Sequence, residues 1–350
     1  MSGLTASAVG TMSGQSASAV GIMPGQSASA AGAMPGLALS AAGPLPGYQK
    51  RPWRQVTAAA NSIAAAGATP VTVLLQGILP VTYEEPVLRE DMKKFFTEAG
   101  ENGLNFCDAS IQVSDQVISP QYYVTCIGKN DLGQEGSSAP GPVSCGLVHS
   151  RKASESANTS LQRQRMLQAG QELIMTRRIA LAGTAALAAA HEEELLRRFP
   201  FRLVERAKSF DQWMPIIGTA RLVDRFGSCP MHCLGQGGIF NALWEMADQA
   251  QVGLDVDLRR IALEQETVEI CEYFDINPYY LYSEGALLIG SDPNQTEILV
   301  QVLHGAGIPA DVIGRVTDKN DRIIRNGENR RFLDRPKQDE LWRFRNDFLT

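Results

Sequence analysis

The stretch Met231-His-Cys-Leu-Gly-Gln-Gly-Gly-Ile-Phe-Asn-Ala-Leu-Trp-Glu245 joins a glycine-rich turn to the start of an amphipathic helix. Phe240, Leu243, Trp244 and Ala247 recur at i, i+3, i+4 and i+7, the spacing of one buried helix face. The first N–H groups of a helix have no intrahelical partner, and the helix dipole adds positive charge there. Such a turn can bind a phosphate, but many are only tight turns, so both interpretations stay open.

Strand-like and helical segments alternate on both sides of this turn. We expect strands at 173–181, 254–256, 286–289 and 312–316, and helices at 183–199, 210–226 and 296–303 besides the one that follows the turn. Alternation of this kind predicts a mixed α/β (α+β) domain over residues 172–316, with 317–350 as a C-terminal extension.

A smaller β/α domain is expected at 51–131. Its segments are an Ala-rich helix at 56–66, an apolar strand at 71–79, a helix from Glu84, and strands at 111–117 and 122–127. Residues 132–171 are rich in Gly, Ser and Pro over much of their length and indicate a linker or long loop.

The N-terminal part has an unusual composition. Residues 1–48 contain no charged side chain, and an 11-residue repeat of small residues starts at Thr5 and recurs at Ser16 and Ser27. Such a segment has too little apolar bulk to offset chain entropy, so we expect residues 1–50 to be a disordered leader. Self-association, surface binding or a product that folds only in part are the alternatives.

Composition limits the function classes. The chain is 44% hydrophobic and 20% charged with a net charge of -6, which gives no reason to expect nucleic-acid or membrane binding. It lacks the features of a signal peptide and a membrane-span pattern, which indicates a cytoplasmic protein. Six scattered cysteines do not form a disulfide framework. Cys229-Pro-Met-His-Cys233 could supply three metal ligands, but no fourth is evident, and buried thiols are the alternative.

A longer series of motifs carries a family resemblance. The segment 231–245 is followed, in order, by Asp275-Ile-Asn-Pro-Tyr, Ser283-Glu-Gly-Ala-Leu-Leu-Ile and Val312-Ile-Gly-Arg-Val-Thr-Asp, and Ala59-Ala-Asn-Ser-Ile-Ala-Ala-Ala-Gly precedes it. These motifs resemble the AIR synthase-related (PurM-like) superfamily, in particular its hydrogenase expression/formation proteins. The resemblance implies a two-domain AIR-synthase-like fold, a homodimer, and use of ATP with Mg²⁺ to activate an oxygen by phosphorylation.

The resemblance also implies site residues. The nucleotide would contact a set drawn from both domains: Asn61, Asp108, Gln112, Asp115, Gly235, Gly237 and Gly238. Asp108 and Asp115 would be the metal ligands, because Mg²⁺ prefers hard oxygen donors. The resemblance assigns no catalytic side chain here.

This chain also departs from the family pattern. Ser62, Cys233 and Gln236 stand where the family has Asp, Asp and Glu, and the first-domain motif at 108–115 lacks the family's glycines, His and Glu. The C-terminal cysteine of the carbamoyl-dehydrating branch is missing, since the chain ends Asp347-Phe-Leu-Thr350. These losses predict impaired chemistry, and the alternative is a non-catalytic scaffold or regulatory homodimer that keeps the fold.

Overall fold

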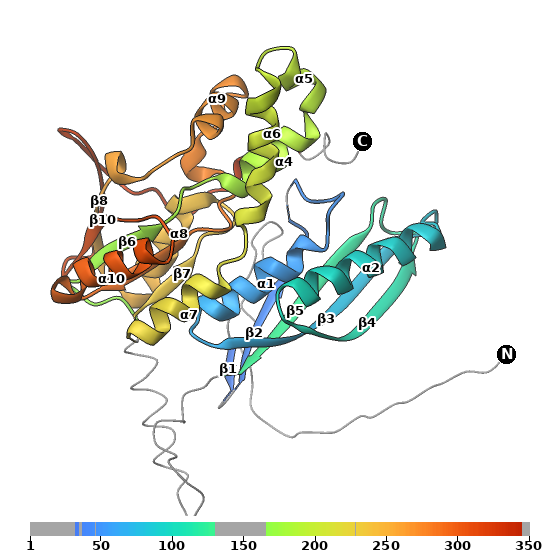
Figure 1. Ribbon diagram of the computed structural model, residues 1–350, viewed down its shortest axis with the longest axis horizontal. Helices are drawn as coiled ribbons and strands as arrows, with labels where there is room; N and C mark the ends of the chain where they lie inside the picture. Colours follow the sequence, from blue (N-terminus) through green and yellow to red (C-terminus); the bar gives the residue numbers. More distant parts are fainter. Residues whose placement is uncertain (1–31, 35–36, 46, 130–165, 228, 345–350) are drawn as a thin grey trace, which may run out of the picture.

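Two mixed β-sheets, each packed against helices, make up the computed structural model (Figure 1). The structure describes residues 32–34, 37–45, 47–129, 166–227 and 229–344. Most of the expected leader and most of the expected linker lie outside these residues. In the described part of the chain no helix is long and apolar enough to cross a membrane.

The first domain is a five-stranded sheet in the order β1-β2-β5-β3-β4, with α1 and α2 on one face (Figure 1). Only β3 and β4 run parallel. Helix α1 ends where Gly67 adopts a φ of 74°, a left-handed conformation that favours glycine. The elements are β1 (Gly32–Met34), β2 (Leu37–Ala42), α1 (Arg54–Ala65), β3 (Thr69–Pro80), α2 (Glu85–Glu101), β4 (Asn105–Ser114) and β5 (Gln121–Lys129).

The N-terminal edge of this domain differs from the expected boundary at residue 50. Strand β2 pairs with β5 along its whole length, although its sequence belongs to the uncharged repeat region. Its inward side chains, Ala38, Ser40 and Ala42, are small and buried, which lets α1 pack closely against the strand. Composition alone predicts disorder for this segment, but backbone pairing with β5 and close packing against α1 hold β2 in the sheet.

The second domain is a seven-stranded sheet in the order β12-β11-β8-β10-β6-β9-β7. Its strands are β6 (Glu172–Thr176), β7 (Met231–Cys233), β8 (Gly253–Asp257), β9 (Leu287–Ser291), β10 (Ala310–Thr317), β11 (Arg322–Asn326) and β12 (Asn329–Phe332). Its α-helices are α4 (Leu181–Ala190), α5 (Glu192–Leu196), α6 (Phe201–Ser209), α7 (Ile217–Phe226), α8 (Gly238–Ala250), α9 (Gln265–Tyr273) and α10 (Pro293–Gly305). Four short 3₁₀ turns complete it: η1 (Phe210–Trp213), η2 (Leu258–Arg260), η3 (Pro278–Tyr280) and η4 (Glu340–Phe344).

Several expected boundaries in this domain are corrected by the structure. The strand expected at 173–181 ends at Thr176, and the helix expected at 183–199 is divided at His191 into α4 and α5. The helix expected at 210–226 is divided into η1 and α7 around Pro215, whose ring and missing N–H interrupt a helix. Strands β11 and β12 extend the sheet beyond residue 316, because β11 pairs parallel to β8.

The two domains share one hydrophobic core, and α1 is the element that joins them. Buried residues of both domains belong to a single contact cluster, and α1 packs on α7 and β7 of the second domain as well as on its own sheet. Because this core is shared, a site between the domains is held by packed helices and strands on both sides.

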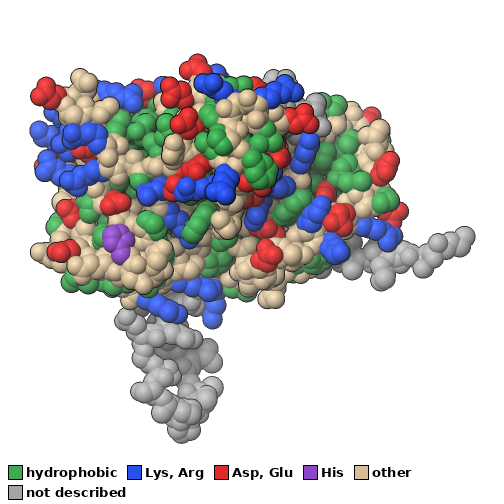
Figure 2. All heavy atoms as spheres, turned by 45° about the horizontal axis from the view of Figure 1, so that its top comes forward, with side chains coloured by type: hydrophobic (Ala, Val, Ile, Leu, Met, Phe, Trp, Pro, Cys, Tyr) green, Lys and Arg blue, Asp and Glu red, His purple; other side chains and the backbone are tan. Residues whose placement is uncertain are grey.

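On the outer surface, acidic and basic side chains are interspersed on the face shown in Figure 2.

Candidate active site between the domains

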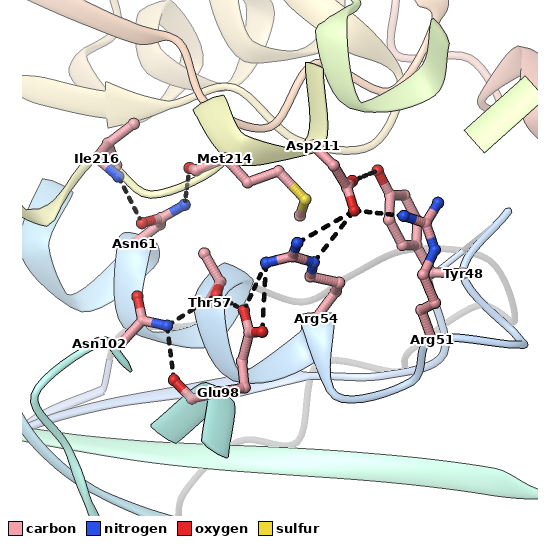
Figure 3. A network of polar contacts seen from close by, with 10 residues as sticks. All are labelled: Tyr48, Arg51, Arg54, Thr57, Asn61, Glu98, Asn102, Asp211, Met214 and Ile216. Atoms are coloured by element: carbon pink, nitrogen blue, oxygen red, sulfur yellow. Dashed lines mark hydrogen bonds and ion pairs between the residues drawn. The ribbon is translucent and has the colours of Figure 1, made fainter. Parts of the chain in front are cut away.

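One polar face of α1 makes the interdomain contact (Figure 3). Arg54 donates to Glu98 of α2 at 3.0 Å and to Asp211 of the second domain at 3.2 Å. Tyr48 also donates to Asp211, at 2.6 Å, and the guanidinium of Arg51 pairs with the same carboxylate. Because Asp211 is buried, these three donors satisfy a charge that would otherwise be costly.

Asn61, about two helical turns beyond Arg54 along α1, is fully buried and uses both ends of its amide. Its Nδ2 donates to the carbonyl of Met214 at 2.8 Å, and its Oδ1 accepts from the N–H of Ile216 at 3.0 Å. The same Nδ2 donates to Oε1 of Glu284 at 2.7 Å. Asn61 thus fixes the segment before α7 and orients a carboxyl group of the second domain.

Glu284 lies at the centre of this contact. Its carboxyl group is enclosed by protein and accepts hydrogen bonds from Asn61, from the Cys233 thiol at 3.0 Å and from the Tyr282 hydroxyl at 3.3 Å. Burial raises the pKa of Glu284 to about 7, and the three hydrogen bonds oppose this rise only in part. A carboxyl group with a pKa near neutrality can both take up and release a proton at physiological pH.

The thiol of Cys233 is not a reactive thiolate. Burial and the neighbouring Glu284 raise its pKa well above the usual range. The thiol donates to Glu284, which is the hydrogen bond expected of the protonated form. Cys233 therefore helps to position Glu284 through this hydrogen bond.

A small cavity adjoins Glu284 between the domains. Its first-domain wall includes Ala58 and Ser62 of α1, and its second-domain wall includes His232, Gln236 and Glu284. The Ser62 hydroxyl donates to the carbonyl of Ala58 at 3.2 Å. His232 is paired with Glu245 at 3.1 Å. Three of the positions that depart from the family pattern, Ser62, Cys233 and Gln236, thus lie together around one cavity.

The glycine-rich turn before α8 is in contact with a carboxylate of the same chain. The N–H of Gly237 donates to Oδ2 of Asp339 at 2.6 Å, and the N–H of Leu341 donates to its Oδ1 at 2.9 Å. Asp339 is buried, which raises its pKa to about 7. Gly237 and Gly238 both have positive φ, and a Cβ on Gly238 would lie 2.5 Å from the carbonyl oxygen of Tyr279. The turn is therefore a tight one, and its anion-binding end holds Asp339.

The remaining expected site residues lie on β4 and just after it, at the edge of the first sheet. Asp108 and Gln112 pair with Leu74 and Ile78 of β3, which puts them on the sheet face opposite the helices. Asp115 follows the end of β4. At about 3.3 Å of rise per residue, Asp108 and Asp115 are roughly 20 Å apart, too far to share one metal ion within a chain. The structure brings neither to Asn61 or to the glycine turn.

The alternative metal site at 229–233 is not assembled. His232 pairs with Glu245, the Cys233 thiol donates a hydrogen bond to Glu284, and Cys229 is buried. Among the described residues, no three His, Cys, Asp or Glu side chains are grouped so that they could hold a metal ion. The described side chains therefore form no metal site of their own, whereas Mg²⁺ commonly uses only one or two carboxylates beside phosphates and water.

The sequence alone does not identify two residues of the candidate site, Glu284 and Asp339. Glu284 lies in the Ser283-Glu-Gly-Ala motif, which in the sequence marks only the family resemblance, and Asp339 lies in the expected C-terminal extension. The signal for Glu284 was a lone acid within an otherwise small and apolar motif. No local pattern pairs Asp339 with a turn about 100 positions earlier, so that contact needed the structure.

Comparisons with known proteins agree with this architecture. Residues 168–325 match the family "AIR synthase related protein, C-terminal domain". A putative hydrogenase expression/formation protein of Methanocaldococcus jannaschii is 23% identical over 82% of this chain and 76% of its own length. The carbamoyl dehydratase HypE of Azotobacter vinelandii is 30% identical over 91 residues, 25% of this chain and 27% of that protein.

A similar solved structure is the hydrogenase maturation protein HypE in complex with ATP. It has a TM-score of 0.61 and 16% identity, and the match covers 89% of this chain and 88% of that one. This similarity confirms the expected two-domain fold. Residues 168–325 of this chain therefore match the AIR synthase-related C-terminal domain, and the chain is similar over most of its length to a hydrogenase-formation protein.

Proposed function

We propose that this protein is an ATP-using enzyme that activates an oxygen of its substrate by phosphorylation, with its reaction centre at the cavity beside Glu284. One observation carries the proposal: a fully enclosed carboxyl group with a pKa of about 7 adjoins a cavity between two domains. Burying such a group opposes stability, and perturbed carboxyl groups in clefts are concentrated at functional sites.

The chain's own residues give Glu284 a defined task. Asn61 and Tyr282 hold its two oxygens by hydrogen bonds of 2.7 and 3.3 Å. In its ionised form the carboxylate can accept a proton from a substrate N–H or O–H group in the cavity, which makes that group a better nucleophile. Cys233 and Tyr282 donate to the ionised form and steady it in this role.

Support for the nucleotide comes from the fold. A superfamily member with the same fold is described in complex with ATP. Since the described residues hold no metal-ligand cluster, an accompanying Mg²⁺ would be held chiefly by the phosphates and water. The expected contacts of Asn61, Asp108, Gln112, Asp115 and the glycine turn with nucleotide remain proposals.

We further propose a homodimer formed through the first sheet. The described helices cover only one face of this sheet, and the other face presents Leu39, Leu74 and Ile127, which are partly exposed (Figure 1). Asp108 and Gln112 lie on that same face. A partner subunit there would bury the apolar centre and could bring both residues to its own site.

The second candidate function is a non-catalytic scaffold. The observation that favours it is the turn before α8, where Asp339 already receives the N–H of Gly237. A substrate phosphate at this turn would have to displace a buried carboxylate that also holds the C-terminal segment. The replacement of acids by Ser62 and Cys233 at the cavity supports the same alternative.

The test is calorimetric titration with ATP and Mg²⁺, followed by measurement of phosphate release in the presence of small carboxylic and amide substrates. The enzyme proposal expects ATP binding in the wild type, and turnover that Glu284→Gln lowers at least about 100-fold with little change in ATP affinity. Glu245→Gln, on the same cavity wall but half exposed, is the matched control. Wild-type protein that gives no heat up to about 1 mM ATP, with a folded dimer on a sizing column, would favour the scaffold.

A further inference from the structure

The short connection between β6 and α4 has an unusual backbone conformation. Arg177 has a φ of 56° and Ala180 a φ of 63°, both in the left-handed region. This region is unfavourable for a residue with a Cβ, so it persists only where neighbouring contacts hold it. Backbone strain of this kind is concentrated at functional sites.

The guanidinium of Arg177 joins two segments that lie beside Glu284. Its Nη1 donates to the carbonyls of Trp213 at 2.5 Å and Pro215 at 3.1 Å. The same nitrogen donates to the carbonyl of Gly285 at 3.1 Å. The half-buried Arg177 thus ties the segment before α7 to the residue that follows Glu284.

Asn61 of α1 holds the same two segments from the first domain. Its amide bonds the carbonyl of Met214 and the N–H of Ile216, as Figure 3 shows. These peptide groups alternate along the chain with the two that Arg177 holds. Asn61 also donates to the Glu284 carboxyl group itself. The segment at 213–216 is therefore gripped from both domains.

The two segments are in direct backbone contact. Gly285 has a φ of 104°, and a Cβ there would lie 2.5 Å from the carbonyl oxygen of Trp213 and 3.2 Å from Cα of Met214. Such a close approach requires glycine. Glu284 is only 5% exposed, so this contact is part of what separates its carboxyl group from water.

We infer that Arg177 is a positioning residue for Glu284, which clamps the segment at 213–215 to Gly285 and so keeps water away from the carboxyl group. Arg177 does not line the cavity beside Glu284, so it acts through these backbone contacts and does not meet the substrate. The inference rests on the proposed function, in which Glu284 transfers protons, but its test does not require turnover.

Loss of the clamp should lower the pKa of Glu284. Burial is the main cause of the raised pKa of this group, and a carboxyl group that regains water returns towards its ordinary pKa. Loss of the positive charge of Arg177 acts in the opposite direction. Three carbonyl dipoles already offset this charge, so the entry of water should dominate.

The ionisation of Glu284 can be measured separately from that of its neighbours. Burial raises the pKa of Cys233 and of Tyr282 well above their usual ranges, so both stay protonated near neutrality. His232 and Glu245 line the adjoining cavity and pair with each other. Comparison of each protein with its own Glu284→Gln counterpart cancels these groups.

The test is urea denaturation between about pH 4 and pH 9 of wild type and Arg177→Met, each with and without Glu284→Gln. The difference within a pair stops changing with pH near the folded-state pKa of Glu284. We expect that pH to fall from about 7 in wild type to about 6 or lower in Arg177→Met. Arg178→Met is the matched control, because the Arg178 guanidinium donates to Glu264 at 2.8 Å and contacts neither segment.

Arg177→Gly repeats the test without the backbone strain, because a φ of 56° is favourable for glycine. It should lower the same pH, since the guanidinium is lost in both variants. A folded Arg177→Met or Arg177→Gly variant that keeps the wild-type value overturns the inference, and so does an equal fall in Arg178→Met. A fall confined to the Arg177 variants, in a wild type that does not turn over ATP, supports the clamp and refutes the proposed function.

Discussion

Replacing Glu284 by Gln should change how the stability of the protein depends on pH. Burial raises the pKa of Glu284 from an ordinary 4.5 to about 7. Between these values the folded protein keeps a proton that the unfolded chain has released, so the free energy of unfolding falls as the pH rises. The contribution is fully present below pH 4.5 and is lost by about pH 7. This pKa difference corresponds to about 3 kcal/mol.

Glutamine matches glutamate in size and cannot ionise. Its amide oxygen can still accept from Asn61 and Cys233, and its N–H can donate to the Tyr282 oxygen, so the variant should fold. Relative to wild type, Glu284→Gln should therefore become more stable by about 3 kcal/mol between pH 4.5 and 7.5. The absolute difference at one pH also contains altered hydrogen bonds, so the change with pH is the informative quantity.

The assay is urea denaturation of both proteins at several pH values across this window. Asp339, whose pKa burial also raises to about 7, is present in both proteins and cancels in the comparison. Glu245→Gln is the control, and its difference from wild type should vary little because that side chain is 45% exposed and screened by water. A wild-type–Glu284→Gln difference that stays constant within about 0.5 kcal/mol across the window would refute the reasoning.

Further predictions concern the glycine turn, the contact between the domains and the C-terminal segment. Gly237→Ala should lower the melting temperature more than Gly307→Ala: both have φ near 75°, but only at Gly237 would the new Cβ overlap a side chain, 1.7 Å from Nδ2 of Asn241. Equal losses would contradict this. Asn61→Ala should destabilise the protein by about 3 kcal/mol in urea denaturation, since it leaves a buried N–H and carbonyl unpaired. An effect below about 1 kcal/mol would show that these bonds contribute little. Asp339→Ala should accelerate hydrogen exchange over 337–344 while leaving β6 protected, and uniform exchange across both would contradict a local role.

Much of the fold could be predicted from local pattern. The helix at α1, the strand at β3 and the helix after the glycine turn follow from residue spacing and from glycine and proline signals. Strand β2 could not be predicted, because its hydrogen bonds come from β5, more than 80 residues later, and its own side chains are small. The continuation into β11 also depends on a partner distant in sequence, because β11 pairs with β8.

The sequence alone determined the family resemblance, the glycine-rich turn and the loss of acids at Ser62, Cys233 and Gln236, since these are properties of residue identity and order. Only the tertiary structure showed that these three positions surround one cavity beside Glu284, and that Asp339 meets the turn. The physical reason is that pKa values and anion contacts depend on burial and on neighbours in space. In the sequence a buried carboxyl group cannot be distinguished from an ordinary one, because its pKa changes only when packing removes its water.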